Sequence, residues 1–328
     1  MLSATMDSSV RAGADILIKT CGGLRSGEAV TVVYDATTEE VARVLLESAT
    51  ALTARVIPVK ITPLSMHGQE PPQDAAEAMA SSDLCLGVTA KSMAHTQARF
   101  AAAKKGARYL SLPDYSLSLL ASPSLRADYH LCAGKARQIA GAFTRGRRVR
   151  VTSPAGTDIV MDIKGRIGNC CPGFVEKPGE LGSPPNIESN VSPIEDSAQG
   201  TVIVDGSIPY PGLGLLKKPI HLEVRRGLIT NFTGDKTTVA KLRRLFDAVG
   251  TNKTRVLAEC GVGLNSLAEL TGVMLTDEGA AGTMHFGFGS NATVGGKNAV
   301  PFHLDFVFRR PSLDVDGKVL IEEGVLKI

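Results

Sequence analysis

The spacing of apolar residues follows two different patterns in the two halves of this chain. This change of pattern constrains the fold more than any other feature of the sequence. Through about residue 145, short runs rich in β-branched residues alternate with segments of helical periodicity. Residues 29–35 (AVTVVYD) are typical of a buried strand, and residues 37–52 have apolar side chains at helical spacing. Strands separated by helices pair in parallel through right-handed crossovers. We therefore expect residues 1–146 to form an open, doubly wound α/β domain with a mostly parallel sheet.

Six further segments complete this alternation. We expect strands at residues 54–61, 83–88 and 108–112, and helices at residues 74–81, 92–106 and 128–145.

The apolar rhythm changes after residue 146. Residues 148–153 and 157–163 alternate with period two around Pro154-Ala-Gly156, which predicts a hairpin. The Gly/Pro-rich stretch 165–193 is expected to be irregular. One helix is expected at 235–249, and strands are expected at 201–208, 221–224, 255–260, 283–288, 300–308 and 318–321. Residues 147–328 are thus predicted to form an α+β domain with a mostly antiparallel sheet.

The charge balance and the apolar pattern narrow the partners that this chain can bind. Its formal net charge is +3, from 36 Lys and Arg residues against 33 Asp and Glu residues. Such a small excess does not favour nucleic acid, and no apolar run reaches the roughly 18 residues of a membrane span. The N-terminal stretch MLSATMDSSVRAGADIL lacks the apolar core of a signal peptide. We expect a cytoplasmic protein without nucleic-acid or membrane partners.

Glycines near the start of the chain do not form a nucleotide-binding motif. Gly22, Gly23 and Gly27 precede the first expected strand, whereas dinucleotide and phosphate loops follow a strand. The first domain is therefore interpreted as a scaffold or a dimer-forming domain.

Six cysteines are spread along the chain, and none belongs to a C-x-x-C motif. They are expected to be reduced and mostly buried thiols. The adjacent Cys170 and Cys171 could form a soft metal site, although chance adjacency accounts for them more simply. Cys260 follows Glu259 directly and could line the same cavity as that carboxylate.

A histidine and an aspartate lie two residues apart inside the apolar segment PFHLDFVF. On a strand, His303 and Asp305 would point to the same side. Burying both groups without a partner is costly, so a metal ion, a partner across the sheet or solvent must compensate. His285 lies in a second strand-like segment with glycines around it, where a ligand could approach closely. A single histidine would be read as a core residue, but two in neighbouring segments favour a metal site.

Carboxylates near these histidines supply further candidate ligands. Glu259 is expected to end a strand and to open a Gly-Val-Gly turn, a common place for a ligand. Asp277 and Glu278 precede His285 in a polar turn and could orient it, or could simply be solvated. Glu188 and Glu195 lie in a polar stretch that carries little signal by composition alone.

Two histidines with several carboxylates suit Zn²⁺, Mn²⁺, Co²⁺ or Fe²⁺. The excess of carboxylates favours two metals bridged by one of them, a pair that can activate water and polarise a carbonyl. The sequence has no G-x-S-x-G motif, which argues against a serine hydrolase.

Longer motifs around these residues resemble the aminopeptidase T-like metallopeptidase family. Pro193-Ile-Glu195-Asp-Ser-Ala-Gln-Gly-Thr201 looks like the start of that family's catalytic domain. The other motifs are Glu259-Cys-Gly-Val-Gly-Leu-Asn265, Asp277-Glu278-Gly-Ala-Ala-Gly282-Thr-Met-His285-Phe-Gly-Phe-Gly289, Gly295-Gly-Lys-Asn298 and His303-Leu-Asp305. The likeness covers residues 180–325 well and the first half only in general layout.

The resemblance implies an α/β N-terminal domain, a homodimer enclosing the active sites, and removal of N-terminal residues from peptides. It also implies a pair of Zn, Co or Mn ions and a short-peptide or other small-molecule substrate. Carried over position by position, the implied ligands are Glu188, Glu259, His285, His303 and Asp305.

One position departs from the family pattern. The peptidases carry a tyrosine seven residues after the position of His285, and this chain has Ala292 there. The chain also resembles a related non-peptidase branch of the superfamily, that of 2,5-dihydroxypyridine 5,6-dioxygenase. That enzyme opens an aromatic ring with one Fe²⁺ held by two histidines and one carboxylate. The chain length is similar to that branch, whereas the presence of Glu259 beside His285 favours two metals.

Three hypotheses follow. The first is a two-metal hydrolase of amide or peptide bonds, in which a metal-bridging hydroxide attacks the carbonyl and Glu188 or Glu278 shuttles the proton. The second is a mononuclear Fe(II) ring-cleaving dioxygenase acting on a dihydroxypyridine-like substrate. The third is a metal-binding protein without catalytic activity.

Overall fold

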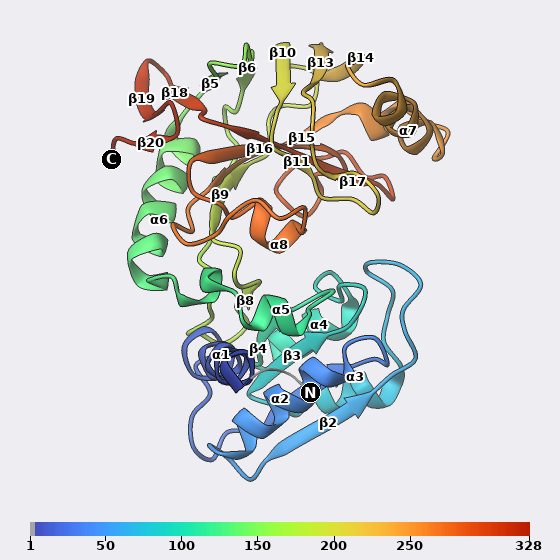
Figure 1. Cartoon of the computed structure of the whole chain (residues 1–328), viewed down its shortest axis with the longest axis vertical. Helices are drawn as coiled ribbons and strands as arrows, with labels where there is room; N and C mark the ends of the chain where they lie inside the picture. The colour runs from blue at the N-terminus through green and yellow to red at the C-terminus, as the bar shows by residue number, and fades with distance from the viewer. Residues whose placement is uncertain (1–3) are drawn as a thin grey trace. The chain divides into compact units, whose positions relative to one another are not determined.

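The computed structural model describes residues 4–328, with the side chains described from residue 8 onward, and it divides the chain into two compact units (Figure 1). Unit 1 contains the chain up to Ala127 and the returning segment Pro172–Pro185, and unit 2 contains Asp128–Cys171 and Asn186–Ile328. This division differs from the predicted boundary after residue 146. Helix α6 (Tyr129–Arg145) was expected in the first domain, but its buried face packs on strands β7 (Asn169–Cys171) and β9 (Glu188–Val191) of unit 2.

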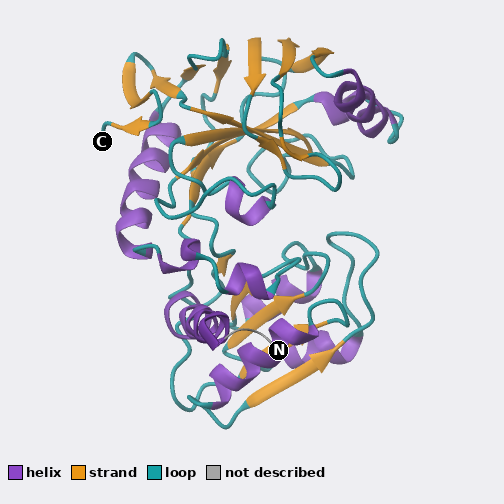
Figure 2. Cartoon of the chain, viewed as in Figure 1, coloured by secondary structure: helices purple, strands orange, loops and turns teal. Residues whose placement is uncertain are grey.

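Unit 1 is the predicted doubly wound α/β domain, which is confirmed (Figure 2). Its sheet has the order β2-β1-β3-β4-β8, and every pairing is parallel. The chain passes from β1 to β2 on one side and then returns across β1 to β3. With right-handed crossovers, the helix after β1 and the helices after β2 and β3 must cover opposite faces. The contacts agree, because α3 packs on α4, whereas α2 packs on α1.

The elements of unit 1 lie close to their predicted positions. Thr96 caps α4, so that helix starts later than the predicted residue 92. The bounds are α1 Ala4–Asp15, π-helical η1 Ile16–Cys21, β1 Val30–Tyr34, α2 Glu39–Thr50, β2 Val56–Lys60, α3 Gln73–Ala80, β3 Leu84–Val88, α4 Gln97–Lys104, β4 Arg108–Ser111, α5 Leu117–Leu120, η2 Pro123–Arg126 and β8 Leu181–Gly182. The N-terminal helix was not predicted, although Val10, Ala14, Leu17 and Cys21 lie at helical spacing and are buried.

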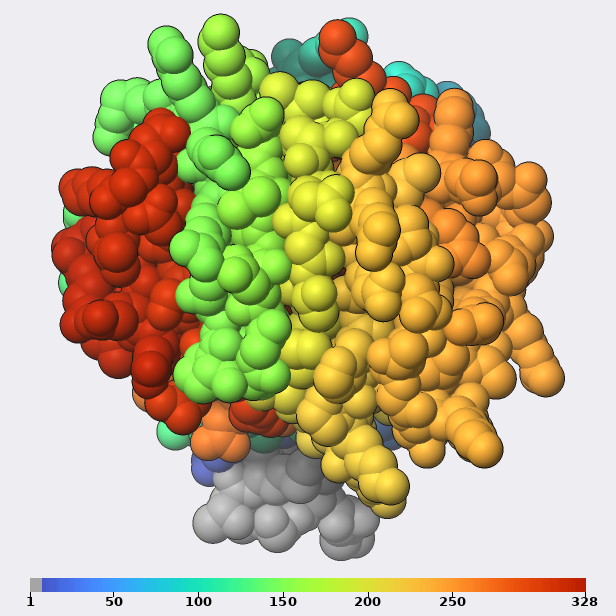
Figure 3. Space-filling model, turned by 90° about the horizontal axis from the view of Figure 1, so that it is seen from above, coloured from blue at the N-terminus to red at the C-terminus, as the bar shows by residue number. Residues whose placement is uncertain are grey.

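Unit 2 contains two antiparallel sheets where one was predicted. An eight-stranded sheet has the order β14-β13-β10-β6-β5-β18-β19-β20, and Figure 3 shows it from outside as bands of gold, yellow, green and red. Its strands alternate buried and exposed residues, as in β13 (Ile220–Arg225), because one face meets solvent. A seven-stranded sheet has the order β12-β11-β17-β16-β15-β9-β7. Strands β15 and β16 are buried at every residue, which places this sheet at the centre of unit 2.

Most predicted strands of unit 2 are present, with two corrections. The predicted strand at 201–208 divides into β10 and β11, which belong to different sheets, and β12, β14, β18 and β20 were not predicted. The remaining bounds are β5 Arg148–Thr152, β6 Asp158–Asp162, β10 Gln199–Val204, β11 Ser207–Ile208, β12 Gly214–Leu215, β14 Leu228–Thr233, α7 Lys236–Asp247, η3 Asn252–Arg255, β15 Leu257–Gly263, α8 Met274–Asp277, β16 Thr283–Gly289, β17 His303–Arg309, β18 Ser312–Val315, β19 Lys318–Glu322 and β20 Val325–Leu326.

The stretch 165–193 was predicted to be irregular, and this was wrong. It contains β7, β8 and β9, and β9 pairs with β15 on one side and with β7 on the other. All four residues of β9 are buried, so the strand shows no polar–apolar alternation that a sequence pattern could reveal. Among residues 4–328, no helix combines the length and the apolar character needed to cross a bilayer.

Two helical glycines give a matched test of the packing. A Cβ on Gly13 of α1 would lie 1.8 Å from the Leu120 carbonyl oxygen, whereas a Cβ on Gly134 of α6 would meet nothing within 4 Å. We expect Gly13→Ala to lower the free energy of unfolding by roughly 1–3 kcal/mol through overpacking. Gly134→Ala should raise it by up to about 1 kcal/mol. Urea unfolding of both variants checks this, and equal effects would contradict the close approach of α1 to α5.

Candidate metal centre

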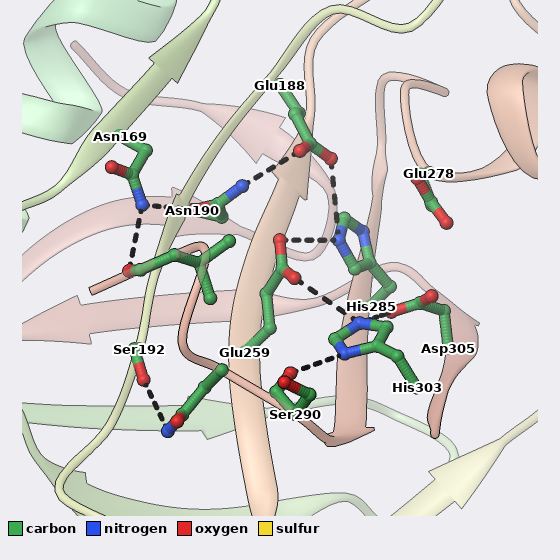
Figure 4. Close-up of polar contacts among 12 residues, drawn as sticks. Asn169, Glu188, Asn190, Ser192, Glu259, Glu278, His285, Ser290, His303 and Asp305 are labelled. Atoms are coloured by element: carbon green, nitrogen blue, oxygen red, sulfur yellow. Dashed lines mark hydrogen bonds and ion pairs between the residues drawn. The ribbon is translucent and has the colours of Figure 1, made fainter. Parts of the chain in front are cut away.

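Four neighbouring strands of the central sheet carry the five predicted metal ligands to one face. Glu188 lies on β9, Glu259 on β15, His285 on β16, and His303 and Asp305 on β17. The register places Gly261 opposite His285 and Gly287 opposite Asp305. Because alternate residues of a strand share a face, these side chains converge over the sheet (Figure 4).

Glycines at the positions between the ligands make room for them. A Cβ on Gly261 would lie 2.1 Å from His285 Nε2, and a Cβ on Gly287 would lie 2.6 Å from His303 Nε2. The Gly-Val-Gly segment after Glu259 belongs to strand β15, so the prediction of a turn at Glu259 was wrong. Glu259 lies within the strand, where Gly261 leaves space for the imidazole of the neighbouring strand.

The ligand atoms form two groups that share Glu259. Glu188, Glu259 and His285 form one group, and Glu259, His303 and Asp305 form the other; within each group the atoms lie within 4.8 Å of one another. His285 Nε2 is 3.4 Å from Glu188 Oε2 and 3.7 Å from Glu259 Oε1. His303 Nε2 is 3.5 Å from Glu259 Oε2 and 3.2 Å from Asp305 Oδ1. The two oxygens of Glu259 thus face different histidines.

His303 is oriented by its second ring nitrogen. Nδ1 lies 2.8 Å from the carbonyl oxygen of Ser290, and a carbonyl can only accept, so Nδ1 carries a hydrogen. Nε2 is left facing Asp305 and Glu259. Metal-binding histidines are commonly held in this way, with the distal N–H donated to a carbonyl or carboxylate.

Burial and charge move the pKa values of the two glutamates in opposite directions. For Glu259, burial acts to raise the pKa, but hydrogen bonds and charges from His285 and His303 outweigh it and lower the pKa to about 2. For Glu188, burial dominates and raises the pKa to about 7, helped by the Glu259 charge and opposed by His285. Glu259 is therefore an anion at neutral pH, whereas Glu188 exchanges a proton there.

Both imidazoles hold protons strongly in the metal-free chain. Burial acts to lower the pKa of His285, but the hydrogen bond to Glu259 and the charges of Glu188 and Glu259 raise it to about 9. The charge of Asp305 and its hydrogen bond to His303 outweigh burial and raise the pKa of His303 well above its ordinary value. Protons thus supply the positive charge that these buried carboxylates require.

The donor set fits a divalent cation. Glu188 Oε2 and His285 Nδ1 are buried without a hydrogen-bond partner among the described residues, and buried polar atoms of this kind usually have one. Imidazole nitrogens and carboxylate oxygens are the ligands of Zn²⁺, Mn²⁺, Co²⁺ and Fe²⁺. A divalent cation held in this cluster would replace the protons and neutralise the excess of carboxylates.

The other predicted residues lie at the edge of this cluster or outside it. Glu278 is half-buried, and its Oε2 accepts from Asn186 Nδ2 at 3.4 Å. Burial, followed by the charges of Asp305 and Glu188, raises the pKa of Glu278 well above its ordinary value. Asp277 does not orient His285. Its buried carboxylate accepts from Ser207 and from the backbone of residues 271 and 272, so it stabilises a loop.

Cys171 and Cys260 lie differently with respect to the ligand cluster. Cys171 borders the site, because it pairs with Glu188 across β7 and β9, and burial and the Glu188 charge raise its pKa well above the ordinary value. Cys260 is buried, and on alternation it points to the sheet face opposite Glu259 rather than into the cluster. Asn190, whose Nδ2 donates to Glu188 Oε1 at 2.9 Å, was missed in the sequence because it lies in the stretch expected to be irregular.

Comparison with known proteins assigns the chain to a family. The family model described as NicX, 2,5-dihydroxypyridine 5,6-dioxygenase, matches residues 16–328. The chain belongs to this family. A curated 2,5-dihydroxypyridine 5,6-dioxygenase from Pseudomonas putida is 28% identical over 190 residues, which cover 55% of this chain. The match spans about half of that relative's length, 54%.

Two solved structures share the fold. The structure of 2,5-dihydroxypyridine dioxygenase from Pseudomonas putida superposes with a TM-score of 0.84 at 21% identity, covering 98% of this chain and 97% of that one. AmpT from Thermus thermophilus superposes with a TM-score of 0.70 at 16% identity, covering 98% of this chain and all of that one. The predicted resemblance to the dioxygenase branch is confirmed by the family match, and the predicted likeness to aminopeptidase T is confirmed at the level of the fold.

Removal of one ligand tests the metal centre. We expect His303→Ala to weaken binding of Zn²⁺ or Fe²⁺ by more than about 100-fold, because loss of an outer partner alone typically costs 10–100-fold. His221→Ala is the matched control, since His221 is an exposed histidine on β13 of the same unit. A competition titration against a chromophoric chelator measures both affinities. Equal affinities in the two variants would contradict a metal at His303.

The protonated state of the site predicts a pH dependence of metal binding. A metal must displace the proton of His285, whose pKa is about 9, so its apparent affinity should rise with pH up to at least about pH 9. The rise should be roughly tenfold per pH unit for each displaced proton. Calorimetry in buffers of different ionisation enthalpy measures the protons released. An affinity that stays constant between pH 6 and pH 8 would show that the histidines are not ligands.

Proposed function

We propose that this chain is a metal-dependent ring-cleaving dioxygenase acting on a dihydroxypyridine-like substrate. The family match over residues 16–328 carries the proposal. The site is compatible with it, because His285, His303 and Asp305 provide two imidazoles and one carboxylate, the donor set of non-heme Fe(II) oxygenases. The peptidases that this chain resembles carry a tyrosine where this chain has Ala292, which lies exposed in the loop after β16. Alanine supplies no phenol at that position.

Each residue of the cluster would have a distinct task. His285, His303 and Asp305 would hold the metal, and Fe²⁺ bound there would supply the one-electron chemistry with O₂ that organic side chains lack. Glu259 faces both histidines and would hold their rings in place. Glu188, with a pKa of about 7, could accept a proton from a substrate hydroxyl and return it to a product. Glu278 at the edge of the cluster would hold a second proton.

A two-metal hydrolase of amide or peptide bonds is the second candidate. One observation favours it: Glu259 belongs to both ligand groups, as a carboxylate bridging two ions would. Zn, Co or Mn would then be the natural ions, a short peptide the natural substrate, and Glu188 or Glu278 the proton shuttle. A homodimer is proposed for either enzyme.

Metal content and substrate turnover separate the two candidates. Protein purified without added metal and reconstituted with Fe²⁺ should bind one ion per chain and consume one O₂ per 2,5-dihydroxypyridine. Peptide amides should not be hydrolysed. Glu259→Gln should keep one bound ion, because the three proposed iron ligands remain. Two Zn, Co or Mn ions per chain, lost in Glu259→Gln together with amide hydrolysis, would instead establish the hydrolase.

A further inference from the structure

The loop between β16 and β17 is closed by two asparagines. The backbone N–H of Asn298 donates to Asn291 Oδ1 at 2.7 Å, and the backbone N–H of Asn291 donates to the Asn298 carbonyl at 3.0 Å. Asn291 is fully buried, and a Cβ on Gly296 would lie 1.9 Å from its Cγ. The amide of Asn291 thus occupies the space that a side chain at residue 296 would fill. The contacts between Asn291 and Asn298 hold the two ends of the loop together.

A partly buried ion pair anchors this loop from outside. Glu195 Oε1 accepts from Lys297 N at 2.7 Å and from Asn291 Nδ2 at 3.1 Å, and its Oε2 accepts from Arg166 Nη2 at 2.5 Å. Arg166 also donates to the Gly295 carbonyl at 2.7 Å. The side chains keep only 11% (Arg166) and 26% (Glu195) of their surface exposed. Burial acts to raise the pKa of Glu195, but these hydrogen bonds outweigh it and lower the pKa, so the carboxylate is charged.

The loop contacts both groups of candidate metal ligands. On one side, Ser290 accepts from His303 Nδ1 through its carbonyl, and its hydroxyl donates to the Asn298 carbonyl at 3.3 Å. On the other side, Asn169 Nδ2 donates to the carbonyl of Val294 at 3.2 Å and to Asn190 Oδ1 at 2.8 Å.

Asn190 continues this second connection, because its Nδ2 donates to Glu188 Oε1. Figure 4 shows both connections converging on the cluster. A shift of the loop would therefore move the partners of His303 and Glu188 together.

We propose that Glu195, paired with Arg166, is a positioning residue that holds this loop so that the Ser290 carbonyl keeps His303 Nε2 aimed at the metal. The inference rests on the proposed function only in that His303 binds a metal ion. The Ser290 carbonyl belongs to a loop with exposed turns, so it needs an anchor. A charged carboxylate with three donors on two loop residues and one arginine provides that anchor.

Co²⁺-loaded protein gives a readout that a merely structural role would not change. Exchangeable N–H protons of cobalt-bound imidazoles give strongly shifted NMR signals, one expected from His303 and one from His285. In Glu195→Gln, the N–H held by Ser290 should exchange with water at least several-fold faster, while the signal of the buried His285 should stay. Co²⁺ affinity should fall about 10–100-fold, as for loss of an outer partner.

Two further variants make the test decisive. Glu28→Gln is the matched control, because Glu28 forms a partly buried 2.7 Å pair with Arg108 in unit 1. It should cost comparable stability without changing either cobalt signal. Arg166→Lys keeps the positive charge but loses the planar guanidinium that also reaches the Gly295 carbonyl. It should change the N–H exchange and the Co²⁺ affinity in the same direction by a smaller amount. This variant serves as the test if Glu195→Gln fails to fold.

The outcomes separate this inference from the metal function. Unchanged Co²⁺ affinity and N–H exchange in Glu195→Gln and Arg166→Lys would overturn the positioning role and leave the metal centre intact. Equal losses in Glu28→Gln would reduce Glu195 to a general contribution to stability. Failure of the wild-type chain to bind Co²⁺, Zn²⁺ or Fe²⁺ would overturn the metal centre and this inference with it.

Discussion

Close approach between neighbouring strands allows charged groups to collect over the central sheet of unit 2. Gly261 and Gly287 lie beside the imidazoles of His285 and His303, and any side chain at either glycine would occupy the space of a ring. The same strands are buried along their whole length, so the groups they carry are removed from bulk water. The position of the site, its burial and its ligand spacing all depend on this one packing constraint.

The chemistry of the site then follows from buried charges that the protein compensates only in part. Carboxylates outnumber imidazoles here, and a low-dielectric environment penalises their uncompensated charge. In the metal-free chain, protons on His285, His303 and Glu188 reduce this penalty. A divalent cation would do the same while releasing those protons. A site of this kind would exchange protons for metal, and the loop anchored by Glu195 would control how closely His303 follows that exchange.

The sequence predicted the layout of unit 1 well because each of its elements forms a self-contained pattern. Strand β1 and helix α2 lie within two residues of their predicted bounds, since a buried apolar run and a helical stripe are local signals. Strand β9 was missed for the opposite reason. Its residues Glu188-Ser-Asn-Val191 have no strand-like pattern of their own, and their partners lie on β7 and β15. Only pairing from both sides makes this segment a strand.

The candidate site divides in the same way. By itself, the sequence determined the residue types, the two-residue spacing of His303 and Asp305, and the motifs that carry the family resemblance, because these are properties of neighbouring residues. Tertiary structure decided that Glu259 faces both histidines, that Cys260 points away, and that Glu195 anchors the loop beside His303. Those relations join residues up to about a hundred positions apart, and their geometry follows from sheet order and register, which no local pattern encodes.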